Sequence, residues 1–155
     1  MKVLMVCLGN ICRSPLAEGI LRYKISRKSL DITVDSAGTG AWHVGQSPDR
    51  RAVDVAAKNN IDISALRGRQ FKAQDFDAFD RILVMDESNY RNVLSLARSE
   101  SDRDKVEYIL NYSLPGSNAC VPDPYFGGPE GFDDVYTMLD QACESFLNTL
   151  TPRQS

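Results

Sequence analysis

The sequence VLMVCLGNICRSP, residues 3–15, decides how the N-terminal part of the chain folds. Its first four residues are apolar, which is typical of a strand buried on both faces of a parallel sheet. Ser14 followed by Pro15 is typical of an N-cap and the first residue of a helix. We therefore expect a strand over residues 2–6, a helix from Pro15 to about Lys24, and a tight turn between them.

Such a strand-to-helix turn is suited to bind an anion. The first backbone N–H groups of a helix have no helical partners, and the helix dipole is positive at that end. Gly9 and Asn10 both tolerate the left-handed backbone angles that would direct several N–H groups toward one point. The residues expected to surround a phosphate are Leu8, Gly9, Asn10, Ile11, Cys12 and Ser14.

Cys7 and Arg13 enclose this turn, with five residues between them, and predict phosphoryl-transfer chemistry. A cysteine beside free N–H groups is favoured as the nucleophilic thiolate, and a guanidinium can donate two parallel hydrogen bonds to phosphate. The Ser14 hydroxyl can donate to the sulfur and help it to leave later. A packed cysteine with a solvated arginine would explain either residue alone, but not their spacing between a strand and a proline.

A second candidate site residue is Asp123, which lies between two prolines in the long loop Asn111 to Gly131. Long loops without regular structure are usually functional, and the prolines would hold the carboxyl group in place. One carboxyl group can protonate a departing oxygen and then deprotonate the attacking water. A simple Asp-Pro turn is the alternative, and Asp49 is the second choice for the acid.

Aromatic residues near these positions predict a slot for a phenyl ring. We expect Trp42, Tyr125 and Phe126, with Leu8, to form its walls, although an isolated tryptophan can equally fill a core. Ser36 is expected either to hydrogen-bond Asn10 or only to cap its own loop. His43, the single histidine, is assigned no catalytic role.

Five blocks of sequence resemble the low-molecular-weight protein tyrosine phosphatases. They follow the family's order and cover nearly the whole chain. The resemblance implies a flavodoxin-like sheet with strand order 2-1-3-4, hydrolysis of phosphotyrosine through a Cys7 thiophosphate, and a Ser36 bond to Asn10. Many members carry a histidine where this chain has Leu66. The blocks are residues 6–15, 35–39, 69–70, 85–86 and 123–125.

Two other functions stay open at this stage. The first is a thiol-dependent arsenate reductase on the same scaffold, which needs further cysteines to relay a disulfide; Cys120 is in a loop, but Cys143 is on a core stripe. The second is a non-catalytic phosphopeptide-binding module. We also expect Cys12 to protect an oxidised Cys7 by forming a disulfide with it.

Composition bounds the remaining possibilities. The 155 residues, 43% hydrophobic and 25% charged, predict one soluble domain over residues 1–155. The alternation of expected strands and helices predicts an α/β fold with a four-stranded parallel sheet flanked by helices. A net charge of −3 gives no reason to expect nucleic acid or a membrane as partner. We expect a cytoplasmic protein without metal or cofactor, with tyrosine-phosphorylated proteins as substrates and inorganic phosphate as product and competitive inhibitor.

The remaining elements follow from periodicity and from turn signals. Residues 61–80 give no clear pattern, and residues 98–105 are expected to form a solvated loop. The expected strands are 32–34, 82–85 and 106–110, and the expected helices are 47–59, 88–97 and 132–150.

Overall fold

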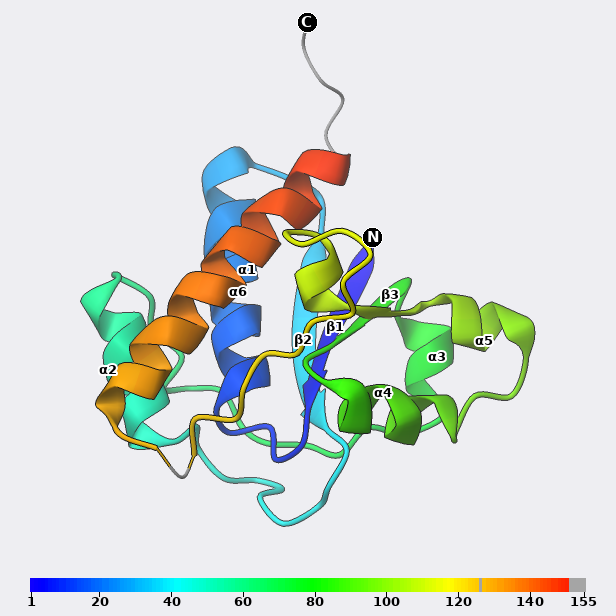
Figure 1. The fold of residues 1–155 in the computed structure, drawn as a ribbon, viewed down its shortest axis with the longest axis horizontal. Coiled ribbons are helices and arrows are strands. Elements are labelled where there is room, and N and C mark those ends of the chain that lie inside the picture. The colour runs from blue at the N-terminus through cyan, green and yellow to red at the C-terminus, as the bar shows by residue number, and fades with distance from the viewer. Residues whose placement is uncertain (126, 151–155) are drawn as a thin grey trace, which may run out of the picture.

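The computed structural model describes residues 1–125 and 127–150 and shows strands alternating with helices (Figure 1). The elements, in chain order, are β1 (Lys2–Cys7), α1 (Arg13–Lys28), β2 (Thr33–Gly38), α2 (Arg50–Lys58), α3 (Asp75–Ala78), β3 (Arg81–Val84), α4 (Glu87–Leu94), α5 (Glu100–Asp104), β4 (Val106–Tyr108), the 3-10 turn η1 (Ile109–Asn111) and α6 (Pro129–Leu150).

The four strands form one parallel sheet in the order β2-β1-β3-β4, which confirms the expected fold class and topology. β1 is central, and Met5 pairs with Ser36 on one side and with Leu83 on the other. Its side chains alternate between two cores, as the two-residue period of a strand requires. Val3 and Met5 belong to the larger core, whereas Leu4 and Val6 belong to the smaller one.

Helices cover both faces of the sheet (Figure 1). α1, α2 and α6 lie on the face that carries the larger core, and α3, α4 and α5 lie on the opposite face. α6 supplies the predicted apolar stripe, in which Phe132, Leu139, Cys143 and Phe146 are almost fully buried. None of the helices in the described ranges is both long and apolar enough to cross a membrane.

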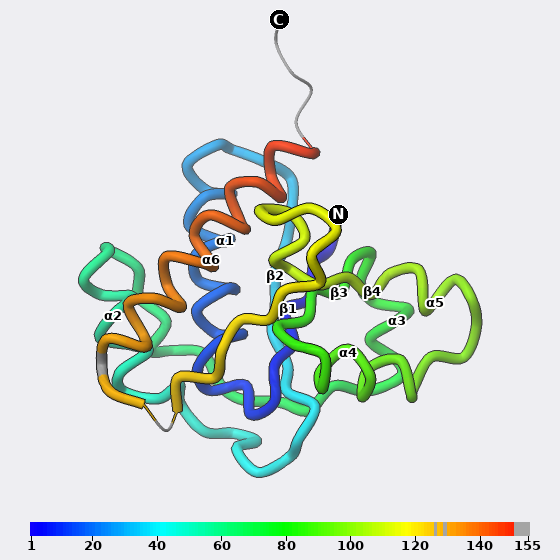
Figure 2. Tube along the Cα trace, viewed as in Figure 1, coloured from blue at the N-terminus to red at the C-terminus, as the bar shows by residue number. Residues whose placement is uncertain are grey.

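The carboxyl ends of the strands all lie at one edge of the sheet, where the loops after β1 and β2 come together (Figure 2). The chain leaves β1 on one face and β3 on the other, so this edge contains a topological switch point. Backbone hydrogen bonds join the two loops there: Thr39 N–H donates to the Cys7 carbonyl, and Gly40 N–H donates to the Leu8 carbonyl, both at 2.9 Å.

The first helix and the second strand are longer than predicted. α1 begins at Arg13 rather than at Pro15, with Cys12 at the N-cap position, and it ends before Ser29, which is left-handed at φ 52°. β2 continues to Gly38, through residues expected to form a loop, because each of them pairs with β1. The loop after β2 therefore starts at the carboxyl edge of the sheet, closer to the switch point than the prediction implied.

The other helices also differ from the prediction, and α6 begins at Pro129 rather than at Phe132. α2 begins at Arg50 because the Asp49 carboxylate, and not Ser47, caps it by accepting the Arg51 N–H at 2.8 Å. Residues 98–105 are not a simple loop, since Ser99 caps α5 by accepting the Asp102 N–H. Two strands end earlier than predicted. β3 ends at Val84, and β4 is followed by η1, which begins at Ile109.

Candidate functional site

A pocket of about 170 Å³ opens at the carboxyl edge of the sheet, where the turn after β1 forms its floor. Nine of the sequence-predicted site residues line it, so residues from three separate loops meet here. Asn10 and Ser14 lie behind the floor, and Phe126 lies outside the described residues. The lining residues are Cys7, Leu8, Gly9, Ile11, Cys12, Arg13, Trp42, His43, Asp123 and Tyr125.

The Cys7 sulfur is held by polar groups although its side chain is almost fully buried. Its Sγ atom lies 3.0 Å from Ser14 Oγ and accepts the Asn10 N–H at 3.3 Å. Ser14 Oγ also accepts a hydrogen bond from the Asn10 side-chain amide at 2.7 Å, and its own single proton can be donated either to the sulfur or, at 3.4 Å, to the Ala37 carbonyl. Donors that face a sulfur favour its anionic form.

Arg13 is the buried cation of the pocket, and two acceptors fix its guanidinium. Nη1 donates to Asp86 Oδ2 at 2.6 Å and to the Val121 carbonyl at 3.0 Å. Burial acts to lower the pKa of Arg13, but the negative charge of Cys7 and the bond to Asp86 outweigh it and raise the pKa. The guanidinium therefore stays charged and oriented. Asp86 was not predicted as its partner, although it follows β3 at the same sheet edge.

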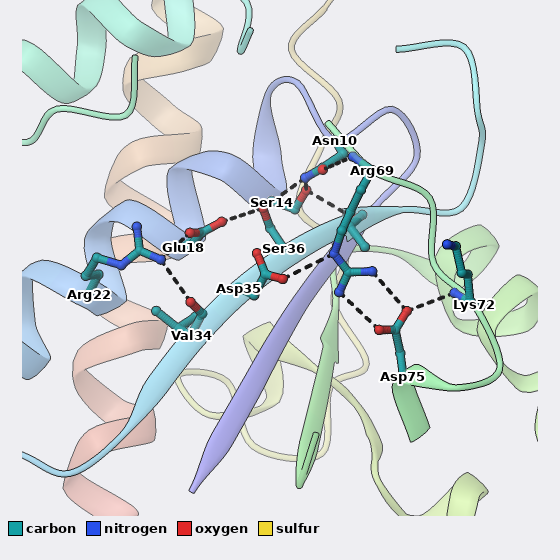
Figure 3. A network of polar contacts seen from close by, with 11 residues as sticks. Asn10, Ser14, Glu18, Arg22, Val34, Asp35, Ser36, Arg69, Lys72 and Asp75 are labelled. Carbon is teal, nitrogen blue, oxygen red and sulfur yellow. Dashed lines mark hydrogen bonds and ion pairs between the residues drawn. The ribbon is translucent and has the colours of Figure 1, made fainter. Parts of the chain in front are cut away.

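Asn10 holds the turn from behind (Figure 3). It is left-handed, with φ 57°, whereas Gly9, which also tolerates that conformation, does not adopt it. Its Nδ2 donates to Ser14 Oγ and to Ser36 Oγ at 3.0 Å, and its Oδ1 accepts the Arg69 N–H at 3.0 Å. The predicted bond between Ser36 and Asn10 is therefore confirmed.

The network continues from Ser36 to a buried acid that the sequence did not reveal. Ser36 Oγ donates to Glu18 Oε1 at 2.6 Å, and Arg22 binds the other oxygen of the same carboxylate. Burial raises the pKa of Glu18, which is 1% exposed, against the opposing bonds from Ser36 and Arg22. Glu18 is one helical turn after Ser14, so the two side chains lie on the same face of α1, and this spacing could have indicated that Glu18 lies near the turn.

A second set of polar contacts fixes the segment around Arg69, which contacts Asn10 (Figure 3). Arg69 Nε donates to Asp35, and the two terminal nitrogens of its guanidinium bind Asp75. Because the Arg69 N–H is the donor to Asn10, these ion pairs hold that donor against the turn. Asp35 and Arg69, which belong to two of the blocks that resemble the phosphatase family, thus form an ion pair with each other. They lie behind the pocket and do not line it.

The walls of the pocket are much more exposed than its floor. The side chains of Trp42 and Tyr125 are 69% and 39% exposed, whereas Cys7 and Arg13 are each 2% exposed. Trp42 therefore forms a wall, as predicted, and is not a core residue. His43 also lines the pocket, and its Nδ1 atom lies 2.8 Å from Gln46 Oε1.

Asp123 lies at the mouth of the pocket, as predicted from its proline neighbours. One carboxylate oxygen accepts the Tyr125 N–H at 3.0 Å, which closes a local turn. The other lies 3.7 Å from Arg13 Nη2, too far for a hydrogen bond but close enough for an ion pair. The carboxyl group is thus free to face a ligand bound at Arg13.

Arg51 ties the Asp123 loop to the start of α2. It donates to the Tyr125 carbonyl at 2.8 Å and to the Gly127 carbonyl at 3.0 Å, and it also lies over the Phe132 ring. Asp49 binds the same guanidinium and, chiefly through that bond, its pKa is lowered. Asp49 is therefore outside the pocket, an ionised partner of Arg51 and a poor reserve acid.

The four cysteines are all free, and they differ in environment. Cys12 lines the pocket but is buried, and burial, with the charges of Asp49 and Cys7, raises its pKa. Cys120 is exposed, whereas Cys143 is fully buried on the core-facing side of α6, where desolvation raises its pKa to about 12. Neither of these last two lines the pocket, so the relay of an arsenate reductase is not assembled.

Fold and site define a phosphate-binding α/β protein with a flavodoxin-like sheet and a cysteine-arginine turn at its switch point. Residues 2–155 match the family model described as low molecular weight phosphotyrosine protein phosphatase, and the chain belongs to that family. A protein of that name from Schizosaccharomyces pombe is 43% identical over 152 residues, covering 96% of each chain.

Two solved structures show the same architecture. A protein tyrosine phosphatase from Entamoeba histolytica, with Hepes in its active site, matches with a TM-score of 0.91 and 37% identity, covering 97% of this chain and 96% of that one. A Drosophila arginine phosphatase matches with a TM-score of 0.91 and 35% identity, covering 99% and 100%. Members of this scaffold thus carry names for two phosphorylated residues.

We predict that Arg51→Ala loosens the Asp123 loop. The variant removes both hydrogen bonds from the guanidinium to the loop carbonyls, so local opening becomes easier. Hydrogen exchange measured on peptides that cover residues 121–128 should become severalfold faster. Arg50→Ala is the matched control, since Arg50 is an exposed neighbour whose ion pair is with Asp54 on the same helix. Equal exchange in the two variants would remove Arg51 as the tie.

Proposed function

We propose that this chain hydrolyses phosphotyrosine in proteins by two successive transfers of the phosphoryl group, first to Cys7 and then to water. The observation that carries the proposal is the position of Cys7 Sγ on the pocket floor, with N–H and hydroxyl donors behind it and the Arg13 guanidinium beside it. The family and the names of the relatives support the same reaction.

In the first transfer the Cys7 thiolate attacks phosphorus, and the tyrosine oxygen leaves on the opposite side. Negative charge spreads over the three other phosphoryl oxygens in the transition state. Arg13, fixed by Asp86, and the N–H groups of the turn bind these oxygens, so little reorganisation is needed as charge develops. Asp123, at the pocket mouth, donates the proton that the departing phenolate requires.

In the second transfer water attacks the phosphocysteine and releases inorganic phosphate. Asp123, now deprotonated, takes the proton from that water. The Ser14 hydroxyl donates to the sulfur as it becomes a thiolate again, which makes the sulfur a better leaving group. Because phosphate binds the same donors as the substrate, we infer that it is both product and competitive inhibitor.

The walls account for the preference for an aryl phosphate. Leu8, Trp42 and Tyr125 provide apolar surface above the floor, and a phenyl ring can pack on them. A phosphoserine is too short to bring its backbone clear of these walls while its phosphate reaches Cys7.

A phosphoarginine peptide is the control substrate for the experiment below, since one protein of similar fold bears the name arginine phosphatase.

We predict that Cys7→Ser abolishes hydrolysis of phosphotyrosine peptides while inorganic phosphate and vanadate still bind. Arg13 and the N–H donors of the turn remain in the variant, whereas the neutral hydroxyl is a far weaker nucleophile than a thiolate. Turnover and vanadate binding are measured on the same preparation, with the phosphoarginine peptide alongside. Turnover close to that of the wild type would exclude Cys7 as the nucleophile, and faster hydrolysis of phosphoarginine than of phosphotyrosine would overturn the substrate assignment.

We predict that Asp123→Asn slows the first transfer by about 10²–10⁴-fold for phenyl phosphate and distinctly less for p-nitrophenyl phosphate. The amide cannot donate an acidic proton, and p-nitrophenolate needs little protonation to depart. Single-turnover measurements are required because breakdown of the phosphocysteine can limit the steady state. Equal losses for both esters would mean that Asp123 only shapes the loop.

We also propose that Cys12 protects Cys7 from irreversible oxidation. A sulfenic acid on Cys7 would condense with the nearby Cys12 thiol to a disulfide, which a reductant can reverse. Both thiols line the same pocket, so the two cysteines belong to one site.

The prediction is that peroxide followed by thiol restores activity in the wild type and much less in Cys12→Ser. Cys120→Ser is the control, because Cys120 is exposed and does not line the pocket. Equal recovery in all three proteins would show that Cys12 protects nothing.

A further inference from the structure

A second pocket lies beside the first and shares two of its walls, Leu8 and Trp42. It has a volume of about 240 Å³, below the roughly 300–1,000 Å³ of pockets that enclose whole small molecules. A cavity of this size suits one amino-acid side chain. Its lining residues are Leu8, Thr39, Gly40, Trp42, Gln70, Phe71, Asn92, Ser95 and Leu96.

Apolar side chains that would ordinarily be buried gather around this second pocket. Eight large apolar side chains are exposed in the described ranges, and three of them, Leu8, Trp42 and Leu96, line it. Leu96 comes from the turn after α4, whereas Trp42 comes from the loop after β2. Exposed apolar groups that cluster at one place mark a binding surface more often than scattered ones do.

The polar groups of the second pocket carry no formal charge. Gln70 donates to the Thr39 carbonyl at 3.3 Å, and Ser95 donates to the Asn92 carbonyl at 2.6 Å. The Thr39 hydroxyl is covered and has no hydrogen-bond partner among the described residues. With no acid or base in the lining, a charged side chain would lose water without gaining an ion pair. The pocket therefore favours an uncharged, largely aliphatic occupant.

We infer that the second pocket binds the side chain of a residue close to the phosphotyrosine in the protein substrate, and that this residue is aliphatic. The inference rests on the proposed function. Because Leu8 and Trp42 line both pockets, a peptide whose phosphotyrosine fills the first pocket can pass over them, and an extended chain advances roughly 3.3 Å per residue. A side chain one or two positions away can therefore enter the second pocket across that shared wall.

Leu96 lines the second pocket but not the first, so a substitution at Leu96 tests this subsite without changing the lining of the first pocket. Phosphotyrosine peptides are compared in which each of the three positions on either side carries leucine, alanine or glutamate in turn. For the wild type we expect leucine to exceed alanine by about tenfold in kcat/KM at one position, with glutamate lowest. In Leu96→Glu that leucine-to-alanine ratio should fall to near one.

The ratio of two peptides on one preparation cancels any loss of active enzyme. Leu114→Glu is the matched control, because Leu114 is an exposed leucine that lines neither pocket, and it should keep the wild-type ratio. The inference is overturned if the wild type shows no preference at any position, or if Leu96→Glu keeps it. Failure of the wild type to hydrolyse any phosphotyrosine peptide would instead overturn the proposed function.

Discussion

The turn between β1 and α1 depends on the left-handed backbone of Asn10. That conformation costs most residues roughly 1–2 kcal/mol relative to the right-handed form, and asparagine is one of the few besides glycine that adopt it. Three side-chain hydrogen bonds, to Ser14, Ser36 and the Arg69 N–H, hold Asn10 there and offset that cost. Because these partners come from α1, from β2 and from the segment after α2, the shape of the phosphate site depends on the whole carboxyl edge of the sheet.

The same edge separates a rigid floor from an adaptable rim. The floor residues Cys7 and Arg13 are buried and held by several polar partners, so their geometry survives whatever binds above them. Trp42 and Leu96 on the rim are exposed. We therefore infer that the buried network sets the chemistry, while the exposed side chains of the rim set the choice of substrate.

Charge is arranged locally, since the chain as a whole is acidic. Asp86 and Asp123 both approach Arg13, but only Asp86 makes a hydrogen bond, and the Val121 carbonyl shares the same nitrogen. A phosphate can thus meet a guanidinium that is already oriented. The Asp123 loop is held in this position because Arg51 donates hydrogen bonds to two of its carbonyls. Asp49 in turn binds Arg51 and caps α2, so its role is structural.

The sequence by itself determined the strand, the turn and the helix around Cys7 and Arg13. Those two residues are six positions apart, so their approach depends on local geometry that an apolar run, a capping position and a proline reveal. The prolines beside Asp123 were equally informative, because they restrict the backbone wherever the loop lies. The parallel sheet followed from the alternation of strands and helices.

Only the tertiary structure decided which charged groups meet. Asp86 is 73 positions from Arg13 in the chain, and Arg51 is 74 positions from the Tyr125 carbonyl that it binds. Sequence shows which residue types can pair, but burial and the docking of distant segments select the pairs. The same reason explains the length of β2, whose last residues lack an apolar pattern and are strand only because β1 supplies their hydrogen bonds.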